Sequence, residues 1–401
     1  MNRGGGSSGW RASGRRSPVR DAAPRRALAA LFFATVTVFA DLYITQPILP
    51  LLSHEFGVPA PTAALTLSVV VLMIALVSNA WGPLGDTFGR KPVMVWSCTL
   101  LALPTLLCAV APTLSALVLL RALQGILLPG VTAVAVAYIG DQFAGSNPGP
   151  AVGGWVGASV TGGLAGRVVS GWIASHLSWR APFVVFGMLT LAGALAMARF
   201  LPPSPRGGPV SIRLAFREMV SHLGHRRLVG GFLIGGSVFF GFIGIFTYLP
   251  YYLSSAPFGL STASISAIYL VYGAGVLTSV VVGRMSGRFG RRTLMAAGFL
   301  IAAGAAALSL VRELPVVILS LVVLCVGMFF VQGTAPAFVN TTAREAKGGA
   351  GALYTTFYYV GATFGSVLPG YAWQAFGWPG VVVACLAAFA VGLLSDIVLC
   401  A

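Results

Sequence analysis

The sequence predicts an all-α integral membrane protein in which twelve transmembrane helices form two six-helix bundles related by pseudo-two-fold symmetry. Three observations predict this fold class. Of the 401 residues, 57% are hydrophobic and only 8% are charged, a balance outside the range of soluble domains. The apolar residues fall into twelve runs, each close to the roughly 20 residues that span a bilayer. A short polar motif between the second and third runs recurs half a chain later.

The twelve predicted helices divide six and six around a Pro-rich stretch that begins at residue 201. The first six cover 27–51, 62–82, 92–111, 114–138, 151–175 and 181–201, and the second six cover 228–253, 262–284, 292–311, 315–341, 348–374 and 378–400. The Gly-, Ser- and Arg-rich start has no apolar period and is expected to be disordered. We therefore predict a cytoplasmic tail over 1–25, one bundle over 26–201, a cytoplasmic linker over 202–227 and a second bundle over 228–401.

Repeated residues indicate that the two halves arose by duplication. The stretch from Gly82 to Met94 reads GPLGDTFGRKPVM, and GRMSGRFGRRTL follows from Gly283, with the first Gly, the Phe-Gly and the basic pair at a constant offset of 201 residues. Three glycines of the fifth predicted helix recur in the eleventh at an offset of 199 residues. These glycines are Gly162, Gly166 and Gly171, which correspond to Gly361, Gly365 and Gly370.

The distribution of basic residues predicts how the chain crosses the membrane. The chain carries 25 Lys and Arg against 9 Asp and Glu, a net charge of +16. Of the basic residues, 21 fall in the tail, the linker and every second loop, whereas the opposite side has only Arg180 and Arg312. Basic loops are retained in the cytoplasm. We therefore expect a multi-pass protein of the cell inner membrane with both termini cytoplasmic, and no nucleic-acid partner.

The sequence favours neither an enzyme nor a metal or cofactor site. The four His residues lie in predicted loops, and no hydrolase motif or phosphate-binding loop of the G-x-x-x-x-G-K-S/T type occurs. The five Cys residues all lie inside apolar runs. Any transport must therefore be driven by an ion or solute gradient rather than by ATP.

Three motifs resemble those of one family of secondary transporters. The pattern G-x-L-x-D-x-x-G-R-K that begins at Gly82 resembles the loop between helices 2 and 3 of the major facilitator superfamily. The pattern R-x-x-Q-G from Arg121 resembles that family's helix 4 motif, which is linked there with proton coupling. The pattern P-x-x-P from Pro47 to Pro50 is similar to the helix 1 motif of the twelve-helix drug:proton antiporter branch. The fifth helix departs from that branch because its glycine motif lacks the proline.

The resemblance implies roles for these residues. It implies two bundles that rock about a substrate site at the membrane midplane, and function as a monomer. It also implies a conformational latch that holds the cytoplasmic side shut, in which Asp86 engages a helix N-terminus or Arg90. The latch residues are Gly82, Asp86, Gly89, Arg90 and Lys91. Gly287 replaces the Asp in the second half, so only one half carries this latch.

Asp41, Arg121 and Arg167 are the ionisable residues that lie deep inside predicted helices. Each is a candidate for proton coupling or substrate binding, because a charge at the bilayer centre costs at least about 2.5–3.5 kcal/mol. Gln46 and Gln124 lie near them in sequence and join the candidate set. A pair of Asp41 with either Arg is geometrically possible. The alternative roles are a static ion pair for Asp41 and structural hydrogen bonds to carbonyl groups for Arg121.

The second half offers aromatic and amide side chains instead of charge. Candidates for the wall of a solute cavity are Tyr269, Gln332, Asn340, Tyr354 and Tyr358. Helix packing is an equally good explanation for the tyrosines. Asp396 lies near the C-terminus and is expected to be solvated at the membrane surface.

We predict a secondary active transporter that exports a small organic solute or drug by proton-coupled alternating access. A first alternative is transport of an anionic metabolite held by Arg121 and Arg167. A second alternative, from another class, is a non-transporting receptor or lipid-handling protein on the same scaffold. Arginines paired with Asp41 favour proton coupling of a neutral or cationic solute, and unpaired arginines favour an anion.

Overall fold

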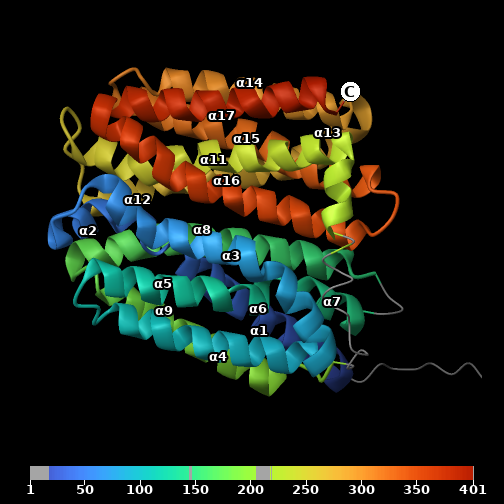
Figure 1. The fold of residues 1–401 in the computed structure, drawn as a ribbon. Helices are drawn as coiled ribbons and strands as arrows, with labels where there is room; N and C mark the ends of the chain where they lie inside the picture. The colour runs from blue at the N-terminus through green and yellow to red at the C-terminus, as the bar shows by residue number, and fades with distance from the viewer. Residues whose placement is uncertain (1–17, 144–146, 205–216, 218, 401) are drawn as a thin grey trace, which may run out of the picture.

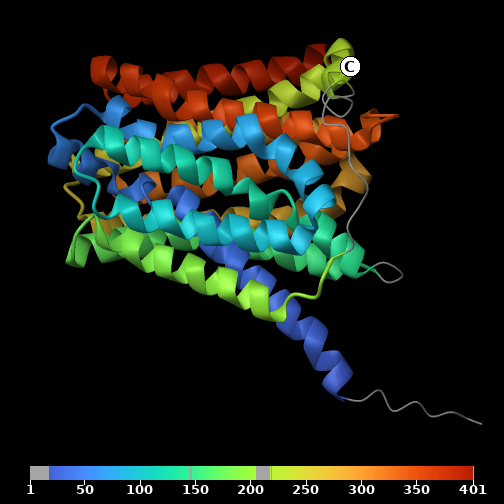
Figure 2. The same ribbon diagram turned by 60° about the horizontal axis from the view of Figure 1, so that its bottom comes forward.

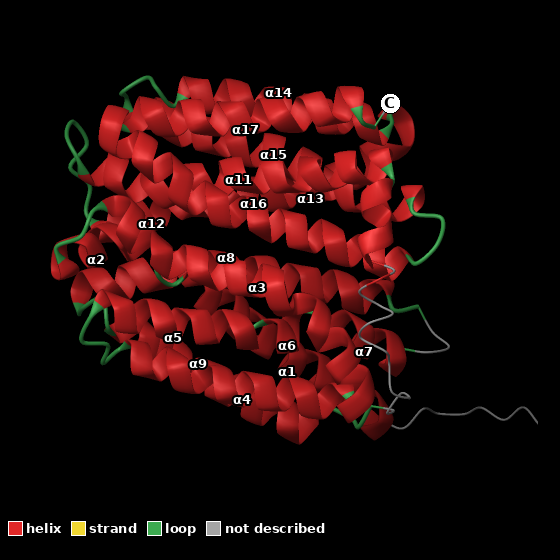
Figure 3. Ribbon diagram, in the orientation of Figure 1, coloured by secondary structure: helices red, strands yellow, loops and turns green. Residues whose placement is uncertain are grey.

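The computed structural model describes residues 18–143, 147–204, 217 and 219–400 of the chain. Within these residues the regular elements are helices joined by short loops (Figure 3). The helices run side by side, and the C-terminus and the amino end of α1 lie on the same side of the molecule (Figures 1 and 2). We call this the terminal side and the opposite one the distal side.

The first half of the chain forms six membrane spans. The first span comprises α1, η1 and α2, and the fourth comprises α5, α6 and α7. The bounds are α1 Pro18–Tyr43, η1 Gln46–Ile48, α2 Leu49–Phe56, α3 Ala60–Phe88, α4 Arg90–Cys108, α5 Leu114–Leu127, α6 Pro129–Thr132, α7 Ala135–Gln142, α8 Gly149–His176 and α9 Ala181–Phe200.

The second half repeats the arrangement after the short helix η2 (His222–Gly224). Its second span comprises α12, η3 and α13. The bounds are α11 Arg226–Ser254, α12 Thr262–Ile268, η3 Tyr269–Val271, α13 Tyr272–Phe289, α14 Arg291–Leu308, α15 Leu314–Thr342, α16 Lys347–Phe376 and α17 Trp378–Val398. The predicted class of twelve helices in two six-helix bundles is confirmed.

Ten of the twelve spans are both long and apolar enough to cross a membrane by length and composition within the described residues. The other two are α8 and α16, which are 28 and 30 residues long. Both have the length to cross a bilayer, and both are rich in glycine, which lowers their hydropathy. They are the fifth helix of each half.

The glycines of α8 and α16 let each helix touch another backbone. A Cβ atom built on Gly162 of α8 would lie 2.4 Å from the carbonyl oxygen of Val36 in α1. A Cβ atom on Gly361 of α16 would lie 2.0 Å from the carbonyl oxygen of Gly236 in α11. No side chain fits at these positions. The glycines of α8 and α16 therefore form packing surfaces, and each bundle contains a close pair between its first and fifth helices.

Prolines divide two of the spans in the first half. Pro47 lies in η1 and Pro50 follows in α2, where the first span bends away from α1. Pro129 starts α6 directly after α5 ends. A proline has no N–H to donate to the preceding turn. The bend in the first span matters because Gln46 lies in it.

Several predicted helix boundaries need correction; for example, α3 ends at Phe88 rather than 82 and α13 at Phe289 rather than 284. The helix α1 begins at Pro18, inside the stretch 1–25 that was predicted to be a disordered tail, and α11 begins at Arg226 rather than 228. Residues 1–17 of the predicted tail lie outside the described residues, as do residues 205–216 and 218 of the predicted linker.

Candidate functional site

A cavity of about 440 Å³ lies between the two bundles. The first bundle contributes Ser78 and Asn79 of α3 and Trp155 of α8, and the second contributes Thr355 and Tyr359 of α16. The wall thus combines aromatic rings with small polar groups. The cavity reaches towards the terminal side, where it is also lined by glycines near the terminal ends of α3 and α16.

Polar contacts join the bundles on the distal side of this cavity. Gln46 donates from Nε2 to Oγ1 of Thr247 in α11 over 3.2 Å. The hydroxyl groups of Ser68 and Ser366 lie 2.7 Å apart, and those of Ser53 and Tyr251 lie 2.6 Å apart. These contacts hold the bundles together distally, and Asn79 of α3 also donates from Nδ2 to Oγ1 of Thr356 in α16 over 3.1 Å, so one contact between the bundles lies beside the cavity.

Arg121 is fully buried, and backbone carbonyl groups bind most of its donors. Its Nε donates to the carbonyl oxygen of Thr66, and Nη1 and Nη2 donate to those of Asp41 and Leu42 over 2.8 Å each. Nη1 also donates to Oε1 of Gln124 over 2.5 Å. The predicted alternative, structural hydrogen bonds to carbonyl groups of neighbouring helices, describes these contacts. Arg121 therefore fixes α1 against α3 and α5.

Asp41 is fully buried in α1, but its carboxyl group is directed at α9 rather than at the cavity. Thr190 of α9 donates to its Oδ2 over 2.7 Å, and Oδ1 has no hydrogen-bond partner. Among the ion pairs of the described residues, none joins Asp41 to Arg121 or to Arg167. Neither of the two pairs considered from the sequence is formed in this structure.

Arg167 of α8 lies among aromatic rings from both bundles, with only 1% of its surface exposed. Its Cζ is 3.7 Å from the ring centre of Tyr43 in the first bundle. It is also 5.5 Å from the ring centre of Tyr272 and 5.9 Å from those of Tyr269 and Phe242 in the second. Cation–π attraction acts over such distances. We call these four rings the aromatic box.

Two of the three guanidinium nitrogens of Arg167 have partners. Nε donates to Oε1 of Gln46 over 2.6 Å, and Nη1 donates to the carbonyl oxygen of Gly163 over 2.7 Å. Nη2 is buried and has no partner. Gln46 therefore connects Arg167 of the first bundle with Thr247 of the second.

The five predicted cavity candidates of the second half have different surroundings. Tyr269 is buried in the aromatic box, where its hydroxyl donates to the carbonyl oxygen of Phe246. Gln332 donates to the hydroxyl of Tyr358 over 2.8 Å, and the ring of Tyr358 stacks on Phe239. Tyr354 is buried against Gly235, and its hydroxyl has no partner. Asn340 is exposed near the end of α15, and none of the five candidates is among the residues that line the cavity between the bundles.

Sequence reasoning did not single out Tyr43, Phe242 or Thr190. Tyr43 and Phe242 had no distinctive sequence signal, because aromatic residues are common throughout the chain. Thr190 could have been found by comparing the two halves of the chain. At the offset of 199 residues its counterpart is Phe389, so a hydroxyl group occurs in one half where the other half has a large ring.

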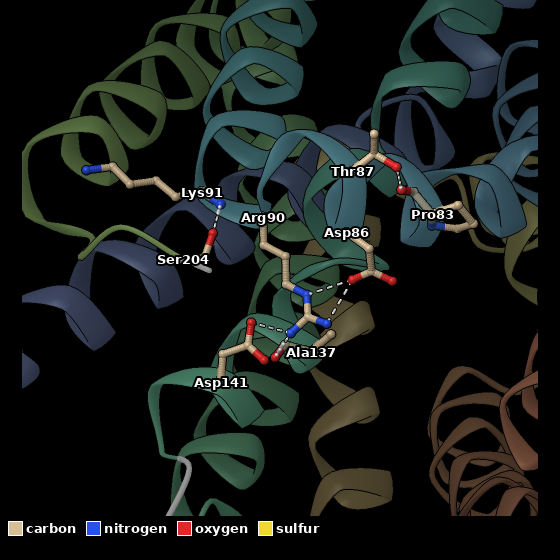
Figure 4. A network of polar contacts seen from close by, with 8 residues as sticks. All are labelled: Pro83, Asp86, Thr87, Arg90, Lys91, Ala137, Asp141 and Ser204. Atoms are coloured by element: carbon tan, nitrogen blue, oxygen red, sulfur yellow. Dashed lines mark hydrogen bonds and ion pairs between the residues drawn. The ribbon is translucent and has the colours of Figure 1, made fainter. Parts of the chain in front are cut away.

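Three of the five predicted latch residues, Asp86, Arg90 and Lys91, make polar contacts on the terminal side (Figure 4), whereas Gly82 lines the cavity. Asp86 accepts from Nη2 of Arg90 over 2.9 Å, and Arg90 also pairs with Asp141 of α7. Lys91 donates from Nζ to the carbonyl oxygen of Leu201 over 2.5 Å. Gly89 joins α3 to α4 with φ of +92°, which favours glycine. These contacts lie within the first half, and Asp86 engages Arg90, one of its two predicted partners.

The expectation that Asp396 is solvated at the membrane surface is wrong. It is 3% exposed rather than solvated, and its Oδ1 lies 3.7 Å from Nε of Arg292 in α14. Arg292 also donates from Nη2 to the Asp396 carbonyl oxygen over 3.0 Å. In the described part of the chain, no group of three or more His, Cys, Asp or Glu residues is suited to hold a metal ion.

Comparisons with known sequences agree with the helical architecture. The family model for the Major Facilitator Superfamily matches residues 31–359 and 255–401. The chain is 31% identical over 360 residues to the uncharacterized MFS-type transporter YybF of Bacillus subtilis (strain 168), with 89% of each chain covered. It is 32% identical over 362 residues to the inner membrane transport protein YnfM of Escherichia coli (strain K12), covering 89% of this chain and 86% of that protein.

Solved structures of low sequence identity share the fold. The nucleoside transporter NupG superposes with a TM-score of 0.78 at 14% identity, covering 93% of this chain and 98% of that chain. The D-xylose-proton symporter superposes with a TM-score of 0.76 at 17% identity, covering 94% of this chain and 97% of that chain. With the family match over most of its length and transporter relatives above 30% identity, the chain belongs to the major facilitator superfamily of membrane transporters.

Proposed function

We propose that this transporter exports a small organic solute across the inner membrane by alternating access coupled to protons. The observation that carries the proposal is the cavity between the bundles, which reaches the terminal side and is bounded distally by contacts between the bundles. The excess of Lys and Arg on the terminal side supports placing that side in the cytoplasm. A solute would then enter the cavity from the cytoplasm. Both walls belong to one chain, which suits a monomer.

Asp41 is the residue that we propose to carry the proton. Its Oδ2 accepts from Thr190, which leaves Oδ1 as a free position to which a proton can be added. Arg121 binds the main-chain carbonyl groups of Asp41 and Leu42. A conformational change that breaks these hydrogen bonds would alter the distance between the Asp41 carboxyl group and the Arg121 guanidinium. Burial and the nearby cation both determine how readily the Asp41 carboxyl group binds a proton. Both would then change with the conformation.

The test is proton movement in proteoliposomes that contain a pH-sensitive dye. Cationic, neutral and anionic solutes are added to the wild type, to Asp41→Asn and to a control, Glu55→Gln. Glu55 is a half-exposed carboxylate paired with Arg180 at the distal surface. We expect solute-dependent proton movement in the wild type and in the control, and its loss in Asp41→Asn. Normal coupling in Asp41→Asn would remove Asp41 as the carrier.

The same assay separates transport from the alternative of a receptor or lipid-handling protein. A transporter exchanges internal for external solute even without a proton gradient. A wild-type protein that produces neither proton movement nor exchange with any solute of the panel would contradict the proposed function.

A further inference from the structure

We infer that Arg167 binds the carboxylate of an apolar or aromatic organic anion, and that this binding breaks the contact between Gln46 and Thr247 that joins the bundles distally. The inference rests on the proposed function, because it assigns a substrate class to the cavity of that transporter. It goes further by naming the anchoring atom, the walls of the site and the contact that the substrate releases.

The surroundings of Arg167 lack a negative charge. None of the ion pairs found among the described residues includes Arg167, although 99% of its surface is buried. A buried cation without an anion is costly, and in a membrane protein such a charge is usually paired or functional. The rings of the aromatic box compensate only part of this cost. The unpartnered Nη2 is the position where an anionic acceptor is missing.

Arg121 does not share this property. Carbonyl oxygens from α1 and α3 and the side chain of Gln124 bind all three of its guanidinium nitrogens. The idea that two arginines together hold an anion therefore reduces to Arg167 alone. The difference between the two residues is one free donor nitrogen.

The geometry of the guanidinium group connects anion binding to the distal contact. Nε and Nη2 lie on one edge of the planar group, and a carboxylate binds an arginine best through two parallel hydrogen bonds. On this edge Nη2 is free, but Nε donates to Oε1 of Gln46. A carboxylate that binds both nitrogens must displace the Gln46 amide. The same amide donates to Thr247 of α11, so its displacement removes a bond between the bundles.

The walls of the site favour a substrate with an apolar or aromatic body. Three rings of the aromatic box, those of Phe242, Tyr269 and Tyr272, belong to the second bundle, whereas Arg167 belongs to the first. An organic carboxylate bound here would touch the charge of one bundle and the rings of the other. Ring faces pack against apolar and aromatic groups and offer few donors to a phosphate or sugar acid.

The box lies close to the cavity but is shut from it in this conformation. Phe39 lines the cavity, and Tyr43 of the box follows four residues later on the same face of α1, about 6 Å further along the helix. The rings of Phe39 and Trp155 meet at 6.3 Å in the cavity wall. We expect a rearrangement of these aromatic side chains to admit a solute to Arg167.

The first experiment measures ligand binding by calorimetry to purified protein in lipid nanodiscs. The probes are benzoate, the isosteric neutral benzamide and inorganic phosphate. We expect saturable binding of benzoate and at least tenfold weaker binding of the other two. Equal affinity for benzoate and benzamide would overturn the anion site, as would no saturable benzoate binding. Equal affinity for phosphate would overturn the assignment of an organic carboxylate.

Variants of Arg167 test the anchoring atom. Arg167→Gln removes the charge, and Arg167→Lys keeps it but lacks the two-nitrogen edge. We expect at least a tenfold loss of benzoate affinity in both, with folding checked by size-exclusion chromatography. Wild-type benzoate affinity in a folded Arg167→Gln or Arg167→Lys protein would contradict the inference. The probe selectivity of the wild type remains decisive if either variant does not fold.

Thr247→Val tests the release of the distal contact. The variant has no hydroxyl to accept from Gln46, so benzoate no longer has to break that bond, and its affinity should rise about two- to tenfold. Ser53→Ala is the matched control, because it removes the distal contact to Tyr251 without touching Gln46 or Arg167. Equal benzoate affinities in Thr247→Val and Ser53→Ala would overturn the release of the contact.

These measurements are independent of the proton assay. Benzoate binding is measured on the wild-type protein at one pH without a gradient, so it can be scored whether or not Asp41 carries a proton. Benzoate binding without any proton coupling would refute the coupling part of the proposed function alone. Proton coupling without benzoate binding would refute the substrate class alone.

Discussion

The two halves of the chain share one helix pairing and differ in what they place around it. In the first half, glycines of α8 lie against the backbone of α1, and in the second half glycines of α16 lie against α11. Asp41 and Thr190 form a hydrogen bond in the first half. Gly162 meets Val36 and Gly361 meets Gly236, so the first helices of the two halves correspond at an offset of 200 residues. Asp41 then corresponds to Gly241 and Thr190 to Phe389, and the ring of Phe389 fills the space at Gly241.

The same contrast holds at the centre and at the terminal side. Arg167 of α8 corresponds to Ser366 of α16, whose hydroxyl lies 2.7 Å from that of Ser68. Asp86 of the latch corresponds to Gly287. The shared glycines show that the duplicated scaffold does not need charge. The charges of the first half are therefore not required by the shared helix pairing, and the second half supplies three of the four rings that surround Arg167.

The largest loss of stability is expected when a substitution disrupts the close pairing of the first and fifth helices, which both halves share. Gly162→Val and Gly361→Val each bring a side chain against a backbone carbonyl group that no rotamer change can avoid. We expect each variant to lose at least about 1–3 kcal/mol of stability, measured as loss of monodisperse protein and a lower thermal midpoint. Gly157→Val in the same helix α8 is the control, because a Cβ there meets no atom within 4 Å. Similar behaviour of all three variants would show that the close pairs are not needed.

An intermediate effect is expected when the first half is made to resemble the second. Asp41→Gly should abolish proton coupling and leave a space beside Thr190. The double variant Asp41→Gly/Thr190→Phe places the ring found in the second half into that space. We expect thermal unfolding to show partial recovery of stability in the double variant, with proton coupling still absent. Lower stability of the double variant than of Asp41→Gly would mean that the two halves do not pack alike at this position.

The smallest effect is expected at the latch, where the side chains are partly exposed. Arg90 pairs with both Asp86 and Asp141 and donates to the carbonyl oxygen of Ala137, so Arg90→Gln loses all three contacts. Exposed ion pairs contribute roughly 0–1 kcal/mol each. Solute exchange rates should fall more in Arg90→Gln than in Asp86→Asn. Arg291→Gln, at the corresponding loop of the second half, should change them least, and the reverse order would refute an asymmetric latch.

The sequence predicted the class of fold because bilayer-length apolar runs and the repeat are local features of a chain. The family resemblance also offered Arg90 as one of two partners for Asp86, and this pair forms across the turn at Gly89 that joins α3 to α4. The sequence did not predict which face of α1 carries Asp41 inward to Thr190, because the helix is apolar on most sides. The partners of Arg121 were equally hidden, since backbone carbonyl groups have no sequence signature.

The glycine-rich character of α8 and α16 has a consequence for how the protein is assembled. A span of low hydropathy partitions weakly into the bilayer by itself, and its glycines gain most of their stabilisation from a closely packed neighbour. That neighbour is α1 for α8 and α11 for α16, in both cases the first helix of the same half. We therefore expect the first helix of each half to remain accessible in the membrane during synthesis until the fifth emerges, and the insertion of each half to be completed by their pairing.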